Sequence, residues 1–277
     1  MGPSALNRFR HSSPSPRESH YKPFFASGES TDAARTISIV IPAFNEAGFI
    51  ETTLASVFEA IKQYPGQVEV IVVDNNSTDG TGDIARRCGA NVVFEAKNQI
   101  ARARNAGAAV ASGDYLIFID ADTSIHGDIL EKVMDTLSSG QFIGGGAWAK
   151  PDSGWFQRLM FDFFINYPLS LKNVTVGPFL YCERAAFERV GGFDESMYAG
   201  EEFSLASRLK KDGKKSNRKW KIIRHHKSHD IITSNRKFSK LGGLGIIEQN
   251  TRLLWKPHEK LRQKDQCAFW YDARRDD

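Results

Sequence analysis

The hydrophobic pattern of this chain alternates between short apolar runs and longer amphipathic segments, starting at Ile37. The short runs, rich in β-branched residues, predict buried strands at residues 37–41, 68–73, 91–94 and 115–119. The segments between them predict helices at residues 50–61, 83–88 and 100–111. Strands that are apolar on both faces and alternate with helices indicate a parallel sheet covered on both sides. We therefore expect an α/β fold with a Rossmann-like, mostly parallel sheet flanked by helices.

Beyond Asp122 the pattern becomes less regular. Helices are expected near residues 128–137, from Arg184 and from about Glu201, and a strand is expected near residues 178–182. The first 35 residues hold four of the ten prolines and seven serines, which predicts a flexible tail over residues 1–35. One folded domain is expected over residues 36–240, divided into halves at 36–125 and 126–240, with a C-terminal helical extension at 241–277.

Composition and charge change this picture little. Hydrophobic residues make up 41% and charged residues 25% of the chain, which is ordinary for a soluble globular protein. The net charge of +4 is too small to indicate nucleic-acid binding by itself. The three widely spaced cysteines suit a reducing compartment. No stretch approaches eighteen uninterrupted apolar residues, so we expect no transmembrane helix and a cytoplasmic location, with peripheral contact at the inner face of a membrane left open.

Polar side chains collect where three of the predicted strands end. The first strand runs into residues 42–46 (PAFNE), the second into residues 74–80 (DNNSTDG) and the fourth into residues 120–122 (DAD). In open parallel sheets, ligands bind beyond the carboxyl ends of the strands. Each cluster alone has a structural explanation, because Asn and Asp are good helix caps and turn formers. Three such clusters on one sheet edge favour a binding site.

Asp120 and Asp122 carry the most specific chemistry. Alternate side chains of an extended segment leave the same face, so two carboxylates two residues apart can share one target. Carboxylate oxygens suit Mn²⁺ or Mg²⁺, which also bind the phosphates of a substrate. The alternative is a solvated loop that carries two acids. The apolar run directly before Asp120 favours the metal site.

Several short motifs follow one another in an order typical of one enzyme family. They are residues 39–46 (IVIPAFNE), 72–81 (VVDNNSTDGT), 103–107 (ARNAG), 120–122 (DAD), 191–195 (GGFDE) and 200–202 (GEE). From Ile37 to about Gly213 the chain therefore resembles a family 2 glycosyltransferase of the A-type fold. The resemblance implies that residues 36–240 form a catalytic domain, which moves a sugar from a UDP- or GDP-sugar donor to an acceptor hydroxyl with inversion and metal assistance.

The resemblance also implies roles on the nucleotide side of such a site. Pro42, Phe44 and Glu46 would border the nucleotide, and Asp74 would read the base through its imide hydrogen. Arg104 would lie near the nucleotide, unless its role is structural. Arg102 is the other candidate for that contact.

On the metal and acceptor side, Asp122 would be the direct metal ligand. Asp120 would contact the ribose or the metal shell, and His229 is a further candidate metal ligand. Glu202, at the start of a helix, would be the catalytic base, although an acid at a helix start is also favoured by the helix dipole alone. Arg236 and its neighbour Lys237 could hold the diphosphate or be solvated charges.

Two departures from the family pattern affect these roles. Asn75 stands where a second aspartate is commoner, which would weaken a base contact there. The later motif reads Glu-Glu where Glu-Asp is usual, so the base would be Glu202, one methylene longer.

Other functions remain open from sequence alone. The run 210–227 holds nine Lys or Arg and one acid, and the stretch 155–165 is unusually apolar, so a peripheral membrane protein is one alternative and a buried helix or homodimer interface is another. A nucleotidyltransferase is disfavoured, because residues 42–46 hold neither glycine nor a cation. The intact acids disfavour a catalytically silent binder. The acceptor, whether glycan, lipid or small molecule, is open, and no nucleic-acid partner is expected.

Overall fold

The computed structural model describes residues 35–171, 177–224, 231–236, 260–263 and 267. The strands are β1 (Ile37–Ala43), β2 (Val68–Asp74), β3 (Asn91–Phe94), β4 (Tyr115–Ile119), β5 (Thr123–Ile125), β6 (Phe142–Ala147), β7 (Lys150–Pro151), β8 (Phe179–Glu183), β9 (Lys219–Ile223) and β10 (Ile231–Thr233). The helices are α1 (Ile50–Gln63), α2 (Thr81–Arg87), α3 (Ile100–Val110), α4 (Ile129–Ser138), α5 (Trp155–Phe161), α6 (Tyr167–Leu171), α7 (Arg184–Arg189) and α8 (Glu201–Lys215), with a π-helical turn at Asp162–Asn166 and a 3₁₀ turn at Lys260–Arg262.

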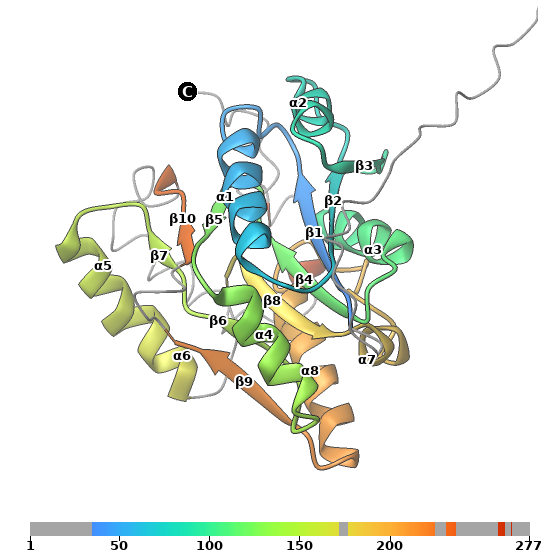
Figure 1. Cartoon of the computed structure of the whole chain (residues 1–277), viewed down its shortest axis with the longest axis vertical. Helices are drawn as coiled ribbons and strands as arrows, with labels where there is room; N and C mark the ends of the chain where they lie inside the picture. The colour runs from blue at the N-terminus through green and yellow to red at the C-terminus, as the bar shows by residue number, and fades with distance from the viewer. Residues whose placement is uncertain (1–34, 172–176, 225–230, 237–259, 264–266, 268–277) are drawn as a thin grey trace, which may run out of the picture.

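The centre of the fold is a seven-stranded sheet in the order β3-β2-β1-β4-β8-β6-β9 (Figure 1). Strands β1 to β4 are mutually parallel, β8 runs antiparallel to β4 and β6, and β9 is parallel to β6. A second, three-stranded sheet has the order β5-β10-β7. The prediction of a mostly parallel α/β sheet flanked by helices is confirmed, and the predicted strands and helices up to Ile119 all form.

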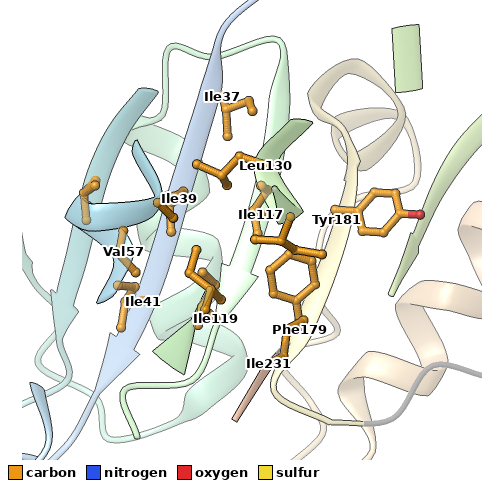
Figure 2. Close-up of a cluster of buried hydrophobic side chains, with 14 of the residues drawn as sticks. Ile37, Ile39, Ile41, Val57, Ile117, Ile119, Leu130, Phe179, Tyr181 and Ile231 are labelled. Atoms are coloured by element: carbon orange, nitrogen blue, oxygen red, sulfur yellow. The ribbon is translucent and has the colours of Figure 1, made fainter. Parts of the chain in front are cut away.

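Two apolar clusters, one on each face of the large sheet, make the core. Because side chains alternate along a strand, Ile39 and Ile41 of β1 belong to one cluster and Val40 to the other. The first cluster is covered by α1, α2 and α4, and part of it is drawn in Figure 2. The second is covered by α3, α7 and α8. This two-sided burial explains why the first strands read as continuous apolar runs.

Five strands escaped the sequence analysis, namely β5, β6, β7, β9 and β10. β5 and β7 are only three and two residues long. β6 contains Gly144–Gly146, and glycine is a poor strand former. β9 lies inside the basic run and exposes Lys219 and Lys221 on one face while Trp220 is buried, as an edge strand can. β10 is only three residues long, so no periodicity can mark it.

The predicted domain limits stay predictions, because the structure describes few residues at either end of the chain. Of the tail expected at 1–35, only Arg35 is described, and of the extension at 241–277 only residues 260–263 and 267 are. Leu261 accepts a backbone hydrogen bond from Tyr198 (2.7 Å) and packs with Cys267 against Met197. Among the described residues, no helix is both long and apolar enough to cross a bilayer.

Gly145 offers a test of the β6 pairing. A Cβ atom at this position would collide with the carbonyl oxygen of Lys221 on β9 and with the ring of Tyr181 on β8. We expect Gly145→Ala to lower the free energy of unfolding by about 1–3 kcal/mol or more, as overpacked substitutions do. Gly154→Ala is the matched control, because its added Cβ meets only the Gln157 side chain at 3.6 Å. Thermal unfolding of both variants measures this, and an equal melting temperature would contradict the assigned β6–β9 register.

Candidate active site

The carboxyl ends of β1, β2 and β4 lie on one edge of the sheet. Ala43 at the end of β1 pairs with Asp74 at the end of β2, and β4 runs parallel to β1 on its other side. The three polar segments that follow these strands therefore start from neighbouring positions, as the sequence analysis expected.

The first two polar segments are joined by hydrogen bonds around Asn45. This residue adopts a left-handed backbone conformation (φ 51°), which asparagine tolerates better than most residues. Its side-chain oxygen accepts the backbone N–H of Thr78 (2.8 Å), and its own N–H donates to the Ser77 hydroxyl (3.1 Å). Asp74 in turn accepts the backbone N–H of Ser77 (2.9 Å). Asp74 and Asn45 are thus fixed relative to each other.

Asp79 holds the backbone beside Glu46. Its carboxylate accepts the N–H of Ala47 (2.9 Å) and both the N–H (3.0 Å) and hydroxyl (2.5 Å) of Thr81. Burial raises the pKa of Asp79, but these hydrogen bonds outweigh it, so the pKa lies below its usual value. The Thr81 hydroxyl accepts the N–H of Glu46 (2.8 Å). Asp79 therefore orders the start of α2 and the segment that carries Glu46.

Asn75 has a structural role that an aspartate could not fill. Its buried amide donates to the backbone oxygens of Glu95 (3.1 Å) and Lys97 (2.7 Å) and accepts the N–H of Gln99 (2.8 Å). A carboxylate has no donors for the first two bonds. Asn75, which departs from the family pattern, therefore stabilises the loop that leads into α3.

Asp120 and Asp122 lie in a turn and not in the extended segment that their spacing suggested. The Asp120 carbonyl accepts the N–H of Thr123 (3.1 Å), and the Ala121 carbonyl accepts the hydroxyl of Thr53 on α1 (2.8 Å). The turn forms because the chain leaves β4 and immediately enters β5 of the second sheet. As a result, the two carboxylates contact different arginines.

Arg104 joins three carboxylates in the interior. Its side chain is 3% exposed and donates to Asp120 (2.9 Å), Glu201 (2.7 Å) and Glu202 (2.8 Å). Its guanidinium also lies 5.3 Å from the centre of the Phe193 ring. Burial lowers the pKa of Arg104, but the three carboxylates outweigh this and raise it, so the residue stays charged. These partners favour the structural alternative for Arg104 over direct contact with a nucleotide.

Glu201 and Glu202 begin α8 but differ in environment. The Glu201 side chain is 3% exposed and that of Glu202 is 21% exposed. Burial and then the negative charge of Glu202 raise the pKa of Glu201 to about 8, although Arg104 opposes the shift. Glu202 is thus the carboxylate of the pair that a second molecule can reach.

Arg236 joins Asp122 to Glu46. One guanidinium nitrogen donates to Glu46 (2.7 Å) and to Asp122 (3.0 Å), and the group stacks 4.1 Å above the Phe49 ring. Ser234, just after β10, also donates its hydroxyl to Asp122 (2.5 Å). Burial lowers the pKa of Arg236, but the two carboxylates outweigh this and raise it.

Of the remaining candidate residues, three lie within the described part of the chain and two lie outside it. Pro42 is buried in β1 and Phe44 is half-buried just after it. Arg102 contacts Glu95 (3.2 Å) and Glu195 (2.8 Å) near the start of α3. His229 and Lys237 lie outside the described residues.

The donor atoms at Asp122 suit a hard divalent cation. Asp122 and Glu46 already share one positive group, the Arg236 guanidinium, so this pair attracts positive charge. Among the residues that the structure describes, no group of three His, Cys, Asp or Glu side chains could hold a metal. A site with few protein ligands is compatible with Mg²⁺ or Mn²⁺, because these ions keep coordination positions for substrate phosphates.

Two residues of this arrangement were missed by sequence analysis. Glu201 was noted only as part of a motif, and its burial against Arg104 has no local signal. Ser234 lies 112 positions from its partner Asp122, so only the pairing of β10 with β5 brings them together.

Curated relatives point to one class of enzyme. Glycosyltransferase AglE of Haloferax volcanii is 32% identical over 177 residues, which cover 59% of this chain and 58% of that protein. The succinoglycan biosynthesis protein ExoA of Rhizobium meliloti is 32% identical over 194 residues, covering 63% of this chain and 58% of that protein. The chain therefore spans less than two thirds of the length of these relatives.

Solved structures share the fold. Mannosyltransferase PcManGT from Pyrobaculum calidifontis, solved with GDP-Man and Mn²⁺, aligns with a TM-score of 0.59 at 21% identity, covering 87% of this chain and 66% of that one. Glucosyl-3-phosphoglycerate synthase from Mycobacterium tuberculosis, solved with Mn²⁺ and UDP, aligns with a TM-score of 0.54 at 21% identity, covering 84% and 80%.

The family model described as glycosyl transferase family 2 matches residues 38–193, which is more than half of the chain. This match includes the three polar segments at the sheet edge and the segment that carries Arg104. With the fold and the relatives, it shows that the chain belongs to glycosyltransferase family 2.

Proposed function

We propose that this family 2 glycosyltransferase moves a sugar from a UDP- or GDP-sugar to an acceptor hydroxyl, with inversion and with a divalent cation. The observation that carries the proposal is the link made by Arg104, which holds the strand-end carboxylate Asp120 and the helix-start carboxylate Glu202 on one guanidinium. Displacement at a sugar carbon needs its leaving group and its proton acceptor within one site.

The nucleotide would bind at the ends of β1 and β2. Asp74 uses one carboxylate oxygen to accept the Ser77 N–H, and its other oxygen would accept the imide N–H of a uracil or guanine base. The half-buried ring of Phe44 offers an apolar surface beside it. Asn45 and Asp79 would act indirectly, by fixing the backbone of these segments.

Asp122 is the residue we propose as the metal ligand, with Asp120 in the outer shell. When bound, Mn²⁺ or Mg²⁺ would offset the charge that develops on the leaving diphosphate. Arg236 is the proposed diphosphate contact, because its planar guanidinium matches two phosphate oxygens and its present partners are the same carboxylates that the cation would neutralise.

Glu202 is the proposed base. The acceptor oxygen attacks the anomeric carbon, its proton passes to a Glu202 oxygen, and the bond from that carbon to the diphosphate oxygen breaks with its electron pair. Attack opposite the leaving group inverts the anomeric carbon. The exposure of Glu202, compared with the burial of Glu201, supports this choice. Arg104 would orient Glu202 and remain charged throughout.

We propose a glycan as the acceptor class, on the names of two of the relatives. ExoA is named for succinoglycan biosynthesis, and TuaG of Bacillus subtilis, 30% identical over 151 residues, is named as a putative teichuronic acid biosynthesis glycosyltransferase. Because the chain covers only 58% and 59% of these proteins, the acceptor remains part of the proposal.

Glu202→Gln tests the base. An amide keeps the shape but cannot take the proton, so we expect turnover to fall by about 10²- to 10⁴-fold while donor affinity stays within about twofold. Release of nucleoside diphosphate measures turnover, and calorimetric titration measures affinity. The control is Glu188→Gln, which changes a 60% exposed carboxylate on α7. Turnover of Glu202→Gln near the wild-type rate would refute the assignment.

Asp122→Ala tests the cation. Wild-type protein with UDP- or GDP-sugar should melt at a higher temperature when Mn²⁺ is added, because a ligand at 100 times its Kd stabilises the folded state by about 2.7 kcal/mol. We expect Asp122→Ala to lose the Mn²⁺-dependent part of the shift. Asp152→Ala, at a 77% exposed aspartate, should retain it. A full Mn²⁺ response in Asp122→Ala would exclude Asp122 as the ligand.

The pH dependence of stability in Glu201→Gln tests the raised pKa of the buried Glu201 carboxyl. An unfolded glutamate titrates near ~4.3, whereas the folded pKa of Glu201 is raised to about 8. The folded state therefore holds the extra proton, and its contribution to stability is complete below the unfolded pKa and is lost as pH rises towards 8. The melting temperature of Glu201→Gln, which stays neutral, should therefore rise relative to that of wild type as pH increases from 5 to 8, and the gap should level off above pH 8. Glu188→Gln should show no such trend, and a gap that shrinks with pH would contradict the raised pKa.

A further inference from the structure

The rod formed by α5, the π-helical turn and α6 carries its apolar side chains on the outside. Six of its large apolar residues are 50–77% exposed, namely Trp155, Phe156, Leu159, Phe163, Tyr167 and Leu171. We call this set the apolar stripe. Elsewhere in the described chain, only Phe94 and Val110 are large apolar residues with comparable exposure. Figure 1 shows the rod along one side of the molecule.

The spacing of the stripe keeps it on one face. From Trp155 to Leu171, five of the six exposed residues recur every four positions, which drifts slowly around an α-helix of 3.6 residues per turn, and Phe156 directly follows the first of them. A π-helical turn has more residues per revolution, so the turn at 162–166 offsets the drift in the middle of the rod.

Two polar side chains of the same rod, Asn166 and Arg158, bond to the neighbouring part of the protein. Asn166 is 7% exposed and donates to the Ala149 carbonyl (2.9 Å) and to Asp162 (2.7 Å). Arg158 donates to the Pro151 carbonyl on β7 (3.2 Å). This orientation is the reverse of that expected for a surface helix of a soluble domain. The exposure of the six stripe residues contradicts the buried-helix explanation for this face of the rod.

We propose that the apolar stripe docks on the surface of a membrane that carries anionic lipids. Tryptophan, tyrosine and phenylalanine are the residues that favour the boundary between headgroups and acyl chains, and a helix lying flat buries one such face. The stripe residues are uncharged. The cation Lys150 belongs to β7, the strand against which α5 packs, and the chain has a net charge of +4. Two acids lie in or next to the rod. Asp152 contacts Arg158, and Asp162 contacts Asn166.

A second copy of the chain is the weaker occupant. A stable protein interface uses about 20–30 residues from each side, whereas the stripe has six residues, five of them in one row. A row along a rod matches a lipid surface, which needs no complementary shape.

The stripe is connected to the proposed active site by one strand. β10 pairs with β7 through Thr233 and Pro151, four residues before the rod begins, and pairs with β5 through Thr233 and Thr123. A docked membrane would therefore lie beside the sheet that carries Asp122. Docking itself does not rest on the proposed reaction, so it is measured without donor.

The test is co-sedimentation of the full chain with vesicles of phosphatidylcholine mixed with phosphatidylglycerol. Wild-type protein should bind, and salt should weaken binding. The double substitution Phe156→Ser with Phe163→Ser should reduce the bound fraction by about tenfold or more, since each exposed ring loses an apolar contact. Phe94→Ser, an equally exposed phenylalanine on β3, is the matched control and should bind as wild type does. Trp155→Ser is a second stripe variant if the double variant melts early.

Several results would overturn the proposal. They are wild-type protein that stays in the supernatant, equal binding to vesicles of phosphatidylcholine alone, and equal losses in the stripe variants and Phe94→Ser. Sedimentation velocity without vesicles adds one more, because a wild-type dimer that the stripe variants convert to monomer would make a second copy the occupant. None of these outcomes bears on donor turnover.

Discussion

Carboxylates from distant parts of the chain meet in this protein because two arginines lie among them. Arg104 holds Asp120, Glu201 and Glu202, and Arg236 holds Glu46 and Asp122. Acids brought so close would repel one another without a cation between them. Arg104 therefore joins the end of β4 to the start of α8. Arg236, just after β10, joins the turn after β4 to the segment after β1.

The two arginines differ in how much they can move. Arg104 is 3% exposed and is enclosed by three acids and Phe193, so removing it would leave Asp120 and Glu202 without their shared cation. Arg236 is 23% exposed and follows a three-residue strand. The first arrangement suits a fixed support for the proposed base. The second suits a group that exchanges carboxylate partners for the phosphates of a donor.

The second sheet connects the proposed chemistry to the outside of the molecule. Its central strand β10 contacts β5, which continues from Asp122, and β7, which leads into the rod of α5 and α6. Polar groups of the rod bond to backbone oxygens near β7 and turn its aromatic face outward. The same small sheet thus supports both a proposed metal ligand and the proposed membrane contact.

The sequence by itself determined the parallel core and the identity of most polar segments at its edge. Apolar runs such as 37–41 and 115–119 bury both faces, and that pattern is local. It could not determine the partners of Arg104, the structural role of Asn75, or the contact between Ser234 and Asp122, because each depends on segments far apart in the chain. The exposure of the apolar residues within 155–171 could not be predicted either, because an apolar stretch has the same sequence pattern whether it is buried or exposed. Those features were decided by tertiary packing, which selects partners by position in space and not by position in the chain.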